Sequence, residues 1–336
     1  MLSFLAPGSS TKVELNESML GGGQVAGLLR FQNNDLAEGR NLLGRMAIAI
    51  SESMNTQNRL GLTLNGQPGE NLFAPISLGN ATPSNFNTST ATMALTVADP
   101  TALQASSYTV SFTAGDAGSV TRHSDGKVFN FDGSALPPVT VASVFSAQGL
   151  GVTLSGAVNA GDQFVINSLQ GAAAELQALQ YSPTDLAAAN PVNAAMGATN
   201  GGSLQLASLK ATGPITQPAT GSPVTIAFTA GSPATYSATV PGPPVATIAT
   251  GNYVSGEKIA INGWEIALQG APKSGDTVTV GNATDSQYGD WYKRDTGNAS
   301  ALMALRDVPM FDNATLADGF ASAMAQVGTR TQSAQF

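Results

Sequence analysis

The sequence contains no cysteine and a single histidine, His123. A Cys/His zinc site, a disulfide framework, a catalytic cysteine and an H-E-x-x-H metalloprotease are therefore excluded. Charge is also scarce, since 14 Lys and Arg and 22 Asp and Glu make up 11% of 336 residues, against about 25% in a typical soluble domain. The net charge of −8 argues against nucleic-acid binding, which rests on clustered Lys and Arg.

Long apolar runs are missing as well. The longest apolar stretches are far shorter than the about 18–20 residues that a bilayer span needs, and Met1–Pro7 lacks the basic residues that open a signal peptide. We therefore expect that any export of the protein uses a route without a cleaved signal peptide.

Catalytic patterns are equally absent. The sequence has no G-x-S-x-G, no G-x-x-x-x-G-K-[ST] and no G-x-G-x-x-G after a strand. Trp264, Trp291 and Tyr292 could form a sugar platform, although burial at the junction between a β-domain and the helices is the simpler interpretation. The sequence therefore predicts a protein that is not an enzyme, with no catalytic residue, no cofactor and no metal ligand.

The charged residues are distributed unevenly along the chain. Residues 1–75 and 298–336 hold 16 charged side chains in 114 residues, whereas residues 76–297 hold 20 in 222. The middle is rich in Ala, Thr, Ser, Gly and Val, with short alternating runs such as Met93–Ala98, which is typical of many short strands. The two ends carry the helical patterns.

Three helices are predicted at these ends. The first begins at Asn34 or Asp35, where Asp35 and Glu38 have capping-box spacing, and runs for about 24 residues to Gly61. Another follows Asn313 and Thr315, and a shorter one spans 298–307 with Asn298 as its cap. Their apolar stripes are predicted to form the helical-domain core or a subunit interface: Leu36, Leu43, Ala47, Ile50, Met54, Leu316, Phe320, Met324 and Val327.

An internal repeat organises the middle of the chain. Thr109–Gly115 (TVSFTAG) and Thr225–Gly231 (TIAFTAG) agree at five of seven positions, and Gly151–Ile166 aligns with Glu265–Val280. Order and spacing agree between the two copies, so we predict two β-units of one topology.

Two shorter correspondences accompany the repeat. Asp162 and Asp276 each follow a glycine and are expected to cap a turn by accepting backbone N–H groups. Residues 137–139 and 243–245 both read Pro-Pro-Val, and we expect them to occupy equivalent places in the two copies.

Seven segments of the chain form a recognisable series in their residues and order: Leu20–Gln32, Leu36–Asn58, Gly61–Phe73, Ala98–Tyr108, Asp185–Ala189, Asn298–Leu305 and Leu316–Thr329. This series resembles the flagellar hook-associated protein 1 family. Residues 209–297 read as an additional β-copy, and the family's long terminal helical regions are not present in the chain. The sequence therefore resembles the middle portion of a family member.

The expected fold class is α+β and multidomain. We predict a helical bundle domain from 1–75 and 295–336, with two related β-rich domains, 76–208 and 209–294, inserted between them. The resemblance implies an extracellular structural protein of the bacterial flagellum at the hook–filament junction. Its partners would be the hook protein, hook-associated protein 3 and further copies of itself in a ring. An extracellular β-sandwich adhesin or polysaccharide-binding module remains the alternative.

Overall fold

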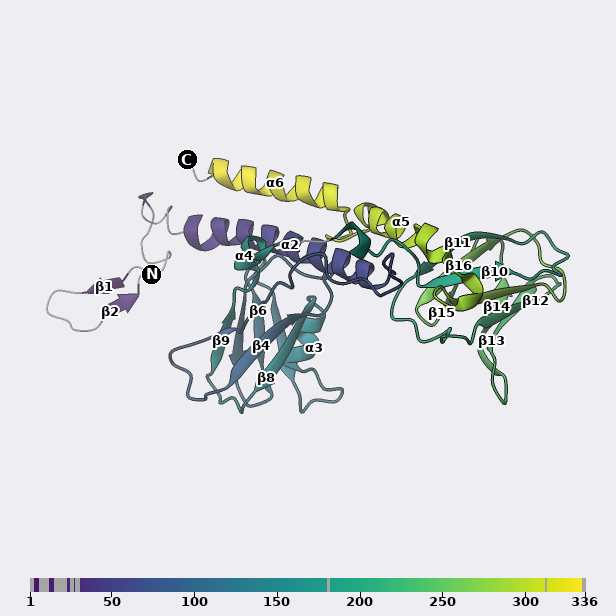
Figure 1. Cartoon of the computed structure of the whole chain (residues 1–336). Coiled ribbons are helices and arrows are strands. Elements are labelled where there is room, and N and C mark those ends of the chain that lie inside the picture. Colours follow the sequence, from purple (N-terminus) through teal and green to yellow (C-terminus); the bar gives the residue numbers. More distant parts are fainter. Residues whose placement is uncertain are drawn as a thin grey trace. The chain divides into compact units, whose positions relative to one another are not determined.

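The computed structural model describes residues 3–5, 12–14, 23, 24, 27, 31–179, 182–311 and 313–333. The fold mixes helices with antiparallel sheets (Figure 1). It divides into two compact units. Unit 1 comprises Met1–Glu52, Pro75–Gln177 and Arg306–Phe336, and unit 2 comprises Ser53–Ala74 and Ala178–Leu305.

The long N-terminal helix has the predicted bounds. Helix α2 spans Leu36–Arg59, which is 24 residues, and the chain turns at Leu60 and Gly61. Asp35 belongs to a π-helical turn, Phe31–Asp35, that runs directly into α2. The predicted capping box at Asp35 is therefore not the start of the helical chain, because helical backbone continues upstream of it.

The C-terminal helices also form. Helix α5 spans Gly297–Ala304 in unit 2 and continues into a 3₁₀ turn, Leu305–Asp307, whereas α6 spans Leu316–Ser333 in unit 1. The cap of α5 is Thr296 rather than the predicted Asn298. The Asn298 side chain is buried and donates to the Ala187 carbonyl at 2.6 Å, so it is used for packing.

Unit 1 contains a first β-sandwich. Its larger sheet has the order β3-β9-β5-β6-β7, and β4 pairs with β8 in the facing sheet. A single core lies between the two sheets, with Phe112, Phe131 and Phe164 in edge-to-face contact. The elements are β3 (Thr82–Pro83), β4 (Thr92–Val97), β5 (Tyr108–Phe112), β6 (Ala117–Arg122), β7 (Val128–Asp132), α3 (Val141–Ser146), β8 (Leu150–Ser155), β9 (Gln163–Ile166) and α4 (Leu169–Ala172). A separate short pair joins β1 (Ser3–Leu5) to β2 (Lys12–Glu14).

Unit 2 contains a second β-sandwich. Its sheets have the orders β10-β17-β12-β13-β14 and β11-β16-β15. Trp264 is completely buried in its core, together with Phe228 and aliphatic side chains. The strands are β10 (Val192–Met196), β11 (Gln205–Ala211), β12 (Val224–Thr229), β13 (Ala234–Val240), β14 (Ala246–Tyr253), β15 (Lys258–Ile261), β16 (Trp264–Gln269) and β17 (Thr277–Asn282). Short 3₁₀ turns lie at Pro183–Asp185, Ser286–Tyr288 and Trp291–Arg294.

The two sandwiches have matching strand orders. In the larger sheets, β3, β9, β5, β6 and β7 correspond to β10, β17, β12, β13 and β14, and the β4-β8 pair corresponds to β11-β16. The first sandwich adds helix α3 between β7 and β8, whereas the second adds β15 before β16. The same antiparallel frame therefore occurs twice in the chain.

Two details of the repeat differ from the sequence analysis. Strands β10 and β11 pair with β17 and β16, so strand pairing groups residues 192–208 with the second sandwich rather than with 76–191. The Pro-Pro-Val segments are not equivalent. Residues 137–139 follow the edge strand β7, whereas 243–245 precede the equivalent edge strand, β14.

Candidate assembly surface

Helix α2 buries a polar face, which the search for apolar stripes missed. The buried polar side chains follow helical spacing and are Asn41, Arg45, Ser51, Asn55 and Asn58. In unit 1, Asn41 Nδ2 donates to Ser107 Oγ at 3.2 Å, and Arg45 Nη1 donates to the Leu103 carbonyl at 3.2 Å. These contacts tie the helix to the segment that leads into β5.

The last turns of α2, in unit 2, also bury hydrogen-bonded polar side chains. Asn55 Oδ1 accepts the N–H groups of Leu72 and Phe73 at 2.8 and 2.9 Å, and its Nδ2 donates to the Phe73 carbonyl at 3.0 Å. Asn58 Nδ2 donates to the Glu70 carbonyl at 2.7 Å. Buried polar groups are tolerated when they are hydrogen-bonded, so these amides fix the 70–73 loop against the helix.

Close backbone packing accompanies the polar face in unit 1. A Cβ atom at Gly44 would lie 1.8 Å from the Leu169 carbonyl oxygen. Only glycine therefore permits α4 to approach α2 at this point. Ala47 and Ile48 are buried beside it in the core of the first sandwich.

The predicted apolar stripe of α2 lies partly in solvent. Ala47 is buried and Ile50 and Met54 are half-buried, but Leu36 and Leu43 are exposed, Leu43 by 45%. The buried face of this helix mixes its polar side chains with Met46, Ala47, Ile48 and Ala49, and two large leucines remain on its accessible side.

Helix α6 lies beside α2 within unit 1 (Figure 1). Gln326 donates to Glu38, and the Arg45 guanidinium lies 5.3 Å from the centre of the Phe311 ring, which packs against Gly319 of α6. The predicted stripe residues of α6 again divide, since Leu316 and Val327 are half-buried whereas Phe320 and Met324 are exposed. Each helix therefore presents large apolar side chains to solvent.

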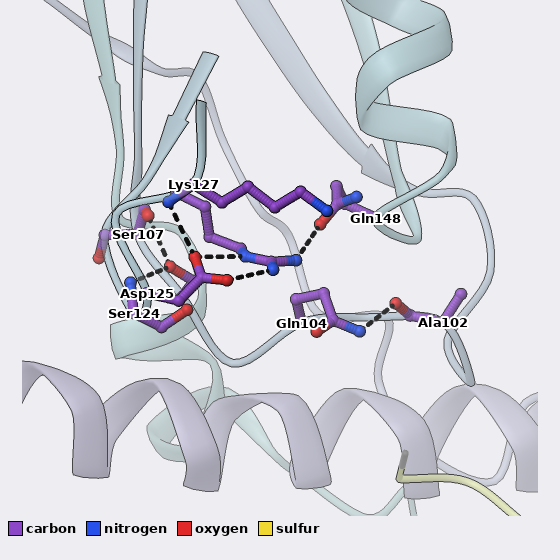
Figure 2. A network of polar contacts seen from close by, with 9 residues as sticks. Ala102, Gln104, Ser107, Ser124, Asp125, Lys127 and Gln148 are labelled. Carbon is purple, nitrogen blue, oxygen red and sulfur yellow. Dashed lines mark hydrogen bonds and ion pairs between the residues drawn. The ribbon is translucent and has the colours of Figure 1, made fainter. Parts of the chain in front are cut away.

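A polar network lies at the β6–β7 turn of the first sandwich (Figure 2). Asp125 accepts from Arg122 Nε at 3.0 Å and Nη2 at 2.5 Å, while Arg122 Nη1 donates to Gln148 Oε1 at 2.7 Å. The Arg122 hydrogen bonds hold the pKa of the Asp125 carboxyl well below its usual range. Ser124 N–H donates to Ser106 Oγ at 3.0 Å, which closes the turn. This network is a structural clamp at the helix-proximal end of the sandwich.

Two further titratable groups near this end have perturbed pKa values. His123 Nε2 lies 2.8 Å from Thr109 Oγ1, and burial lowers the pKa of His123. Burial also raises the pKa of Tyr108 to about 12. A neighbouring cavity of about 690 Å³ is lined by amide and hydroxyl side chains such as Asn41 and Ser107, together with the charged residues Asp35, Glu38 and Arg40.

The described ranges contain neither a metal-binding cluster nor a membrane-spanning helix. Among these residues no group of three or more His, Asp or Glu side chains could hold a metal ion. No helix in the described part of the chain is long and apolar enough to cross a membrane.

The three aromatic residues singled out from the sequence have different environments. Trp264 is buried, and Tyr292 packs against the small cluster of Leu62, Ala189 and Ala283. Trp291, which we expected to be a buried anchor, is 57% exposed because it lies on the outer side of a 3₁₀ turn.

Comparison with known proteins identifies the chain. Residues 2–73 match the flagellar hook-associated protein FlgK helical domain, and residues 82–168 match the D2-like domain of flagellar hook-associated protein 1. The chain is FlgK-like, similar to flagellar hook-associated protein 1 in both of these domains. The resemblance inferred from the sequence segments is therefore confirmed.

Individual relatives agree with this assignment. The chain is 30% identical over 190 residues to flagellar hook-associated protein 1 of Escherichia coli (strain K12), a match that covers 56% of this chain and 33% of the relative. It is 29% identical over 181 residues to flagellar hook-associated protein 1 of Salmonella typhimurium, covering 53% of this chain and 31% of the relative. The matched region thus spans about a third of these curated relatives.

A solved structure extends the similarity to nearly the whole chain. The flagellar hook junction protein FlgK from Burkholderia pseudomallei is similar with a TM-score of 0.74 and 26% identity. The alignment covers 98% of this chain and 62% of that chain. The Burkholderia structure therefore has counterparts for both the helices and the two sandwiches of this chain.

Proposed function

We propose that this chain is part of a structural protein that joins the flagellar hook to the filament. The observation that carries the proposal is the similarity over 98% of the chain to a flagellar hook junction protein. The half-exposed apolar stripes on α2 and α6 fit a role in assembly, because a monomer gains nothing from leucine and phenylalanine side chains on accessible helix faces. The comparisons give no support to the adhesin alternative.

The proposed organisation follows from the same features. The helical segments within 1–75 and 295–336 hold subunits together, although they are divided between the two units, with α6 in unit 1 and α5 in unit 2. The stripe residues, led by Leu43 and Phe320, contact neighbouring subunits. Such a junction needs many weak contacts between subunits, and a surface with few charges permits close packing.

The proposed partners are the hook protein, hook-associated protein 3 and further copies of this chain in a ring. We place the protein outside the cell, in the flagellum, reached by export without a cleaved signal peptide. No enzymatic activity forms part of the proposal, because an assembly joint requires binding surfaces rather than reactive groups.

The test compares two leucines of equal exposure in the full-length protein in flagellated cells. Leu43 is 45% exposed on α2, and Leu206 is 43% exposed on β11. Leu43→Asp should abolish filament growth from the hooks, whereas Leu206→Asp should leave it intact. Both purified variants should melt within a few degrees of the parent, because both side chains are half in solvent.

Three outcomes would count against the proposal. Normal filaments in the Leu43→Asp strain would show that the α2 stripe is not part of the subunit interface. If gold-labelled antibody against the protein marked the cell body, or if deletion of the gene left motile, filamented cells, the junction role itself would be wrong.

A further inference from the structure

The turn after β3 in the first sandwich presents an aromatic ring to solvent. Phe86 is 91% exposed within the β-turn Ser84–Asn87, in which Asn87 N–H donates to the Ser84 carbonyl at 3.1 Å. Ser84 N–H and Asn87 Nδ2 both donate to the Gln163 carbonyl at 2.9 Å, and Gln163 N–H donates to Asn87 Oδ1 at 2.8 Å. The turn is thus clamped to the start of β9, so Phe86 is held in place.

The second sandwich supplies an internal control for this turn. Gly197–Asn200 forms the same turn with the same clamp, since Gly197 N–H and Asn200 Nδ2 donate to the Thr277 carbonyl at 2.9 and 2.8 Å. Thr277 N–H donates back to Asn200 Oδ1 at 2.8 Å. The residue equivalent to Phe86 is Thr199, which is also exposed. The turn forms without an aromatic side chain, so the fold does not require Phe86.

A second large apolar side chain emerges at the same end of the first sandwich. Leu136 is 96% exposed at the tip of the 133–138 loop, which is closed by reciprocal hydrogen bonds between Asp132 and Val139 at 2.8 and 3.1 Å. Pro83 pairs with Phe164 and Ala117 pairs with Asp132, which places both loops at the end of the sheet opposite the β6–β7 turn. The two loops lie on opposite edges, β3 and β7, about 19 Å apart at about 4.8 Å per strand.

We propose that Phe86 of one subunit docks against the Leu136 loop, residues 133–138, of a second copy of this chain. An anchor on one edge and a receiving loop on the opposite edge make a head-to-tail contact, which is the geometry that closes a ring of identical subunits. This inference rests on the proposed function for the ring itself, and it adds the residues that join neighbouring sandwiches.

Charge supports a second copy as the partner. The chain carries a net charge of −8, so two copies repel unless they meet through neutral surface. Residues 71–98, around Phe86, contain no charged side chain. The Leu136 loop is itself uncharged, and the carboxylates of Asp132 and Asp116 lie at its base, so the uncharged Phe86 surface can approach it without bringing like charges together. A rigid aromatic side chain on such a surface provides buried contact area with little loss of conformational entropy.

The absence of cysteine makes the test direct, because introduced thiols are the only ones in the protein. In the full-length protein, assembled in flagella, we expect Phe86→Cys with Leu136→Cys to form a ladder of cross-linked multimers with a short bismaleimide. The multimer fraction should exceed that of either single variant at least tenfold. The matched control, Thr199→Cys with Leu136→Cys, should remain monomeric.

The outcomes separate this contact from the proposed function. Filaments that assemble without a ladder in the double variant would overturn the docking contact and leave the junction role standing. Dimers from Phe86→Cys alone would show a symmetric contact and would also overturn it. Absence of the parent protein from the hook–filament junction would overturn the proposed function, and the docking contact with it.

Discussion

The two β-sandwiches share one frame and fill it differently. The first packs three phenylalanine rings, Phe112, Phe131 and Phe164, edge to face, whereas the second packs one edge-to-face pair, Phe228 and Tyr253, with Trp264 and aliphatic side chains. Both keep the turn before the last strand. Gly161 and Gly275 have φ of +91° and +93°, and Phe112 and Phe228 N–H donate to the carbonyls of Asp162 and Asp276, both at 2.9 Å. The comparison indicates that the fold depends on these backbone hydrogen bonds, while the core tolerates different side chains.

The largest effects are expected from removing one large buried side chain from each core. Phe164→Ala and Trp264→Ala each remove a completely buried ring and should cost about 3–5 kcal/mol of unfolding free energy. Both tryptophans, Trp264 and Trp291, lie in unit 2, so tryptophan fluorescence reports on that unit alone. Denaturation followed by fluorescence should be unchanged in Phe164→Ala, while circular dichroism should show an earlier transition.

That expectation rests on the separate cores of the two units. If Phe164→Ala also moved the fluorescence midpoint, the two sandwiches would unfold as one cooperative unit. Trp264→Ala can be followed by circular dichroism, with the exposed Trp291 as the remaining fluorophore.

The next effect concerns the two aspartates of the shared turn. Asp162 accepts the N–H groups of Thr88 and Asn159, both at 2.8 Å, and the Ser89 hydroxyl, followed by the Asn159 N–H, lowers its pKa to about 2. Asp276 accepts from Lys273, Gly201 and Gly202, and the Lys273 N–H is the main cause of its lowered pKa. A carboxylate with a lowered folded-state pKa stabilises the fold above the unfolded value, about 3.9.

This stabilisation is lost as pH falls from about 4 through the folded pKa of about 2 for Asp162. Asp162→Asn should therefore lower the melting temperature at pH 7 by several degrees and flatten the loss of stability between pH 4 and 2. Asp276→Asn should do the same for unit 2. The exposed Glu257→Gln serves as the control. If both aspartate variants lost stability between pH 4 and 2 as the parent does, the aspartate hydrogen bonds would not account for the pH dependence.

A smaller effect is expected at a position that is charged in the second sandwich and uncharged in the first. Glu265 on β16 lies 3.2 Å from Lys210 Nζ and 2.9 Å from Lys258 Nζ, across all three strands of its sheet. The position aligned with it in the first sandwich is Gly151. Burial disfavours the charged carboxylate, but the two lysines outweigh it and leave the pKa of Glu265 lowered. Both lysines are well exposed, so the pairs stabilise weakly.

Glu265→Gln should cost under about 1 kcal/mol, and the difference from the parent should shrink in high salt. Urea denaturation at low and high NaCl, followed by tryptophan fluorescence, measures both. A loss of several kcal/mol that salt does not change would mean that Glu265 acts through packing instead.

The sequence predicted some of these features better than others. The bounds of α2 follow from its apolar period and from Gly61, and the strand–turn–strand blocks stand out because their residues repeat. The assignment of β10 was missed because VNAAM has no clear alternation and pairs with β17, far along the chain. The buried face of α2 was missed because asparagine and serine at helical spacing are usually assigned to solvent. The predicted equivalence of the two Pro-Pro-Val segments was wrong because the same tripeptide occurs in two different loops, after β7 and before β14.

The smallest effect is expected from exchanging the residues that distinguish the two clamped turns. Phe86→Thr gives the first turn the residue of the second, and Thr199→Phe does the reverse. Both positions are exposed, and the hydrogen bonds of each turn come from the backbone, from Asn87 or Asn200 and from Asp162 or Asp276. Neither exchange removes a contact of the folded chain, so each should change the unfolding free energy by no more than about 0.5 kcal/mol. Thermal unfolding of both variants beside the parent measures this, and a clear destabilisation by Phe86→Thr would show that the ring packs within its own sandwich.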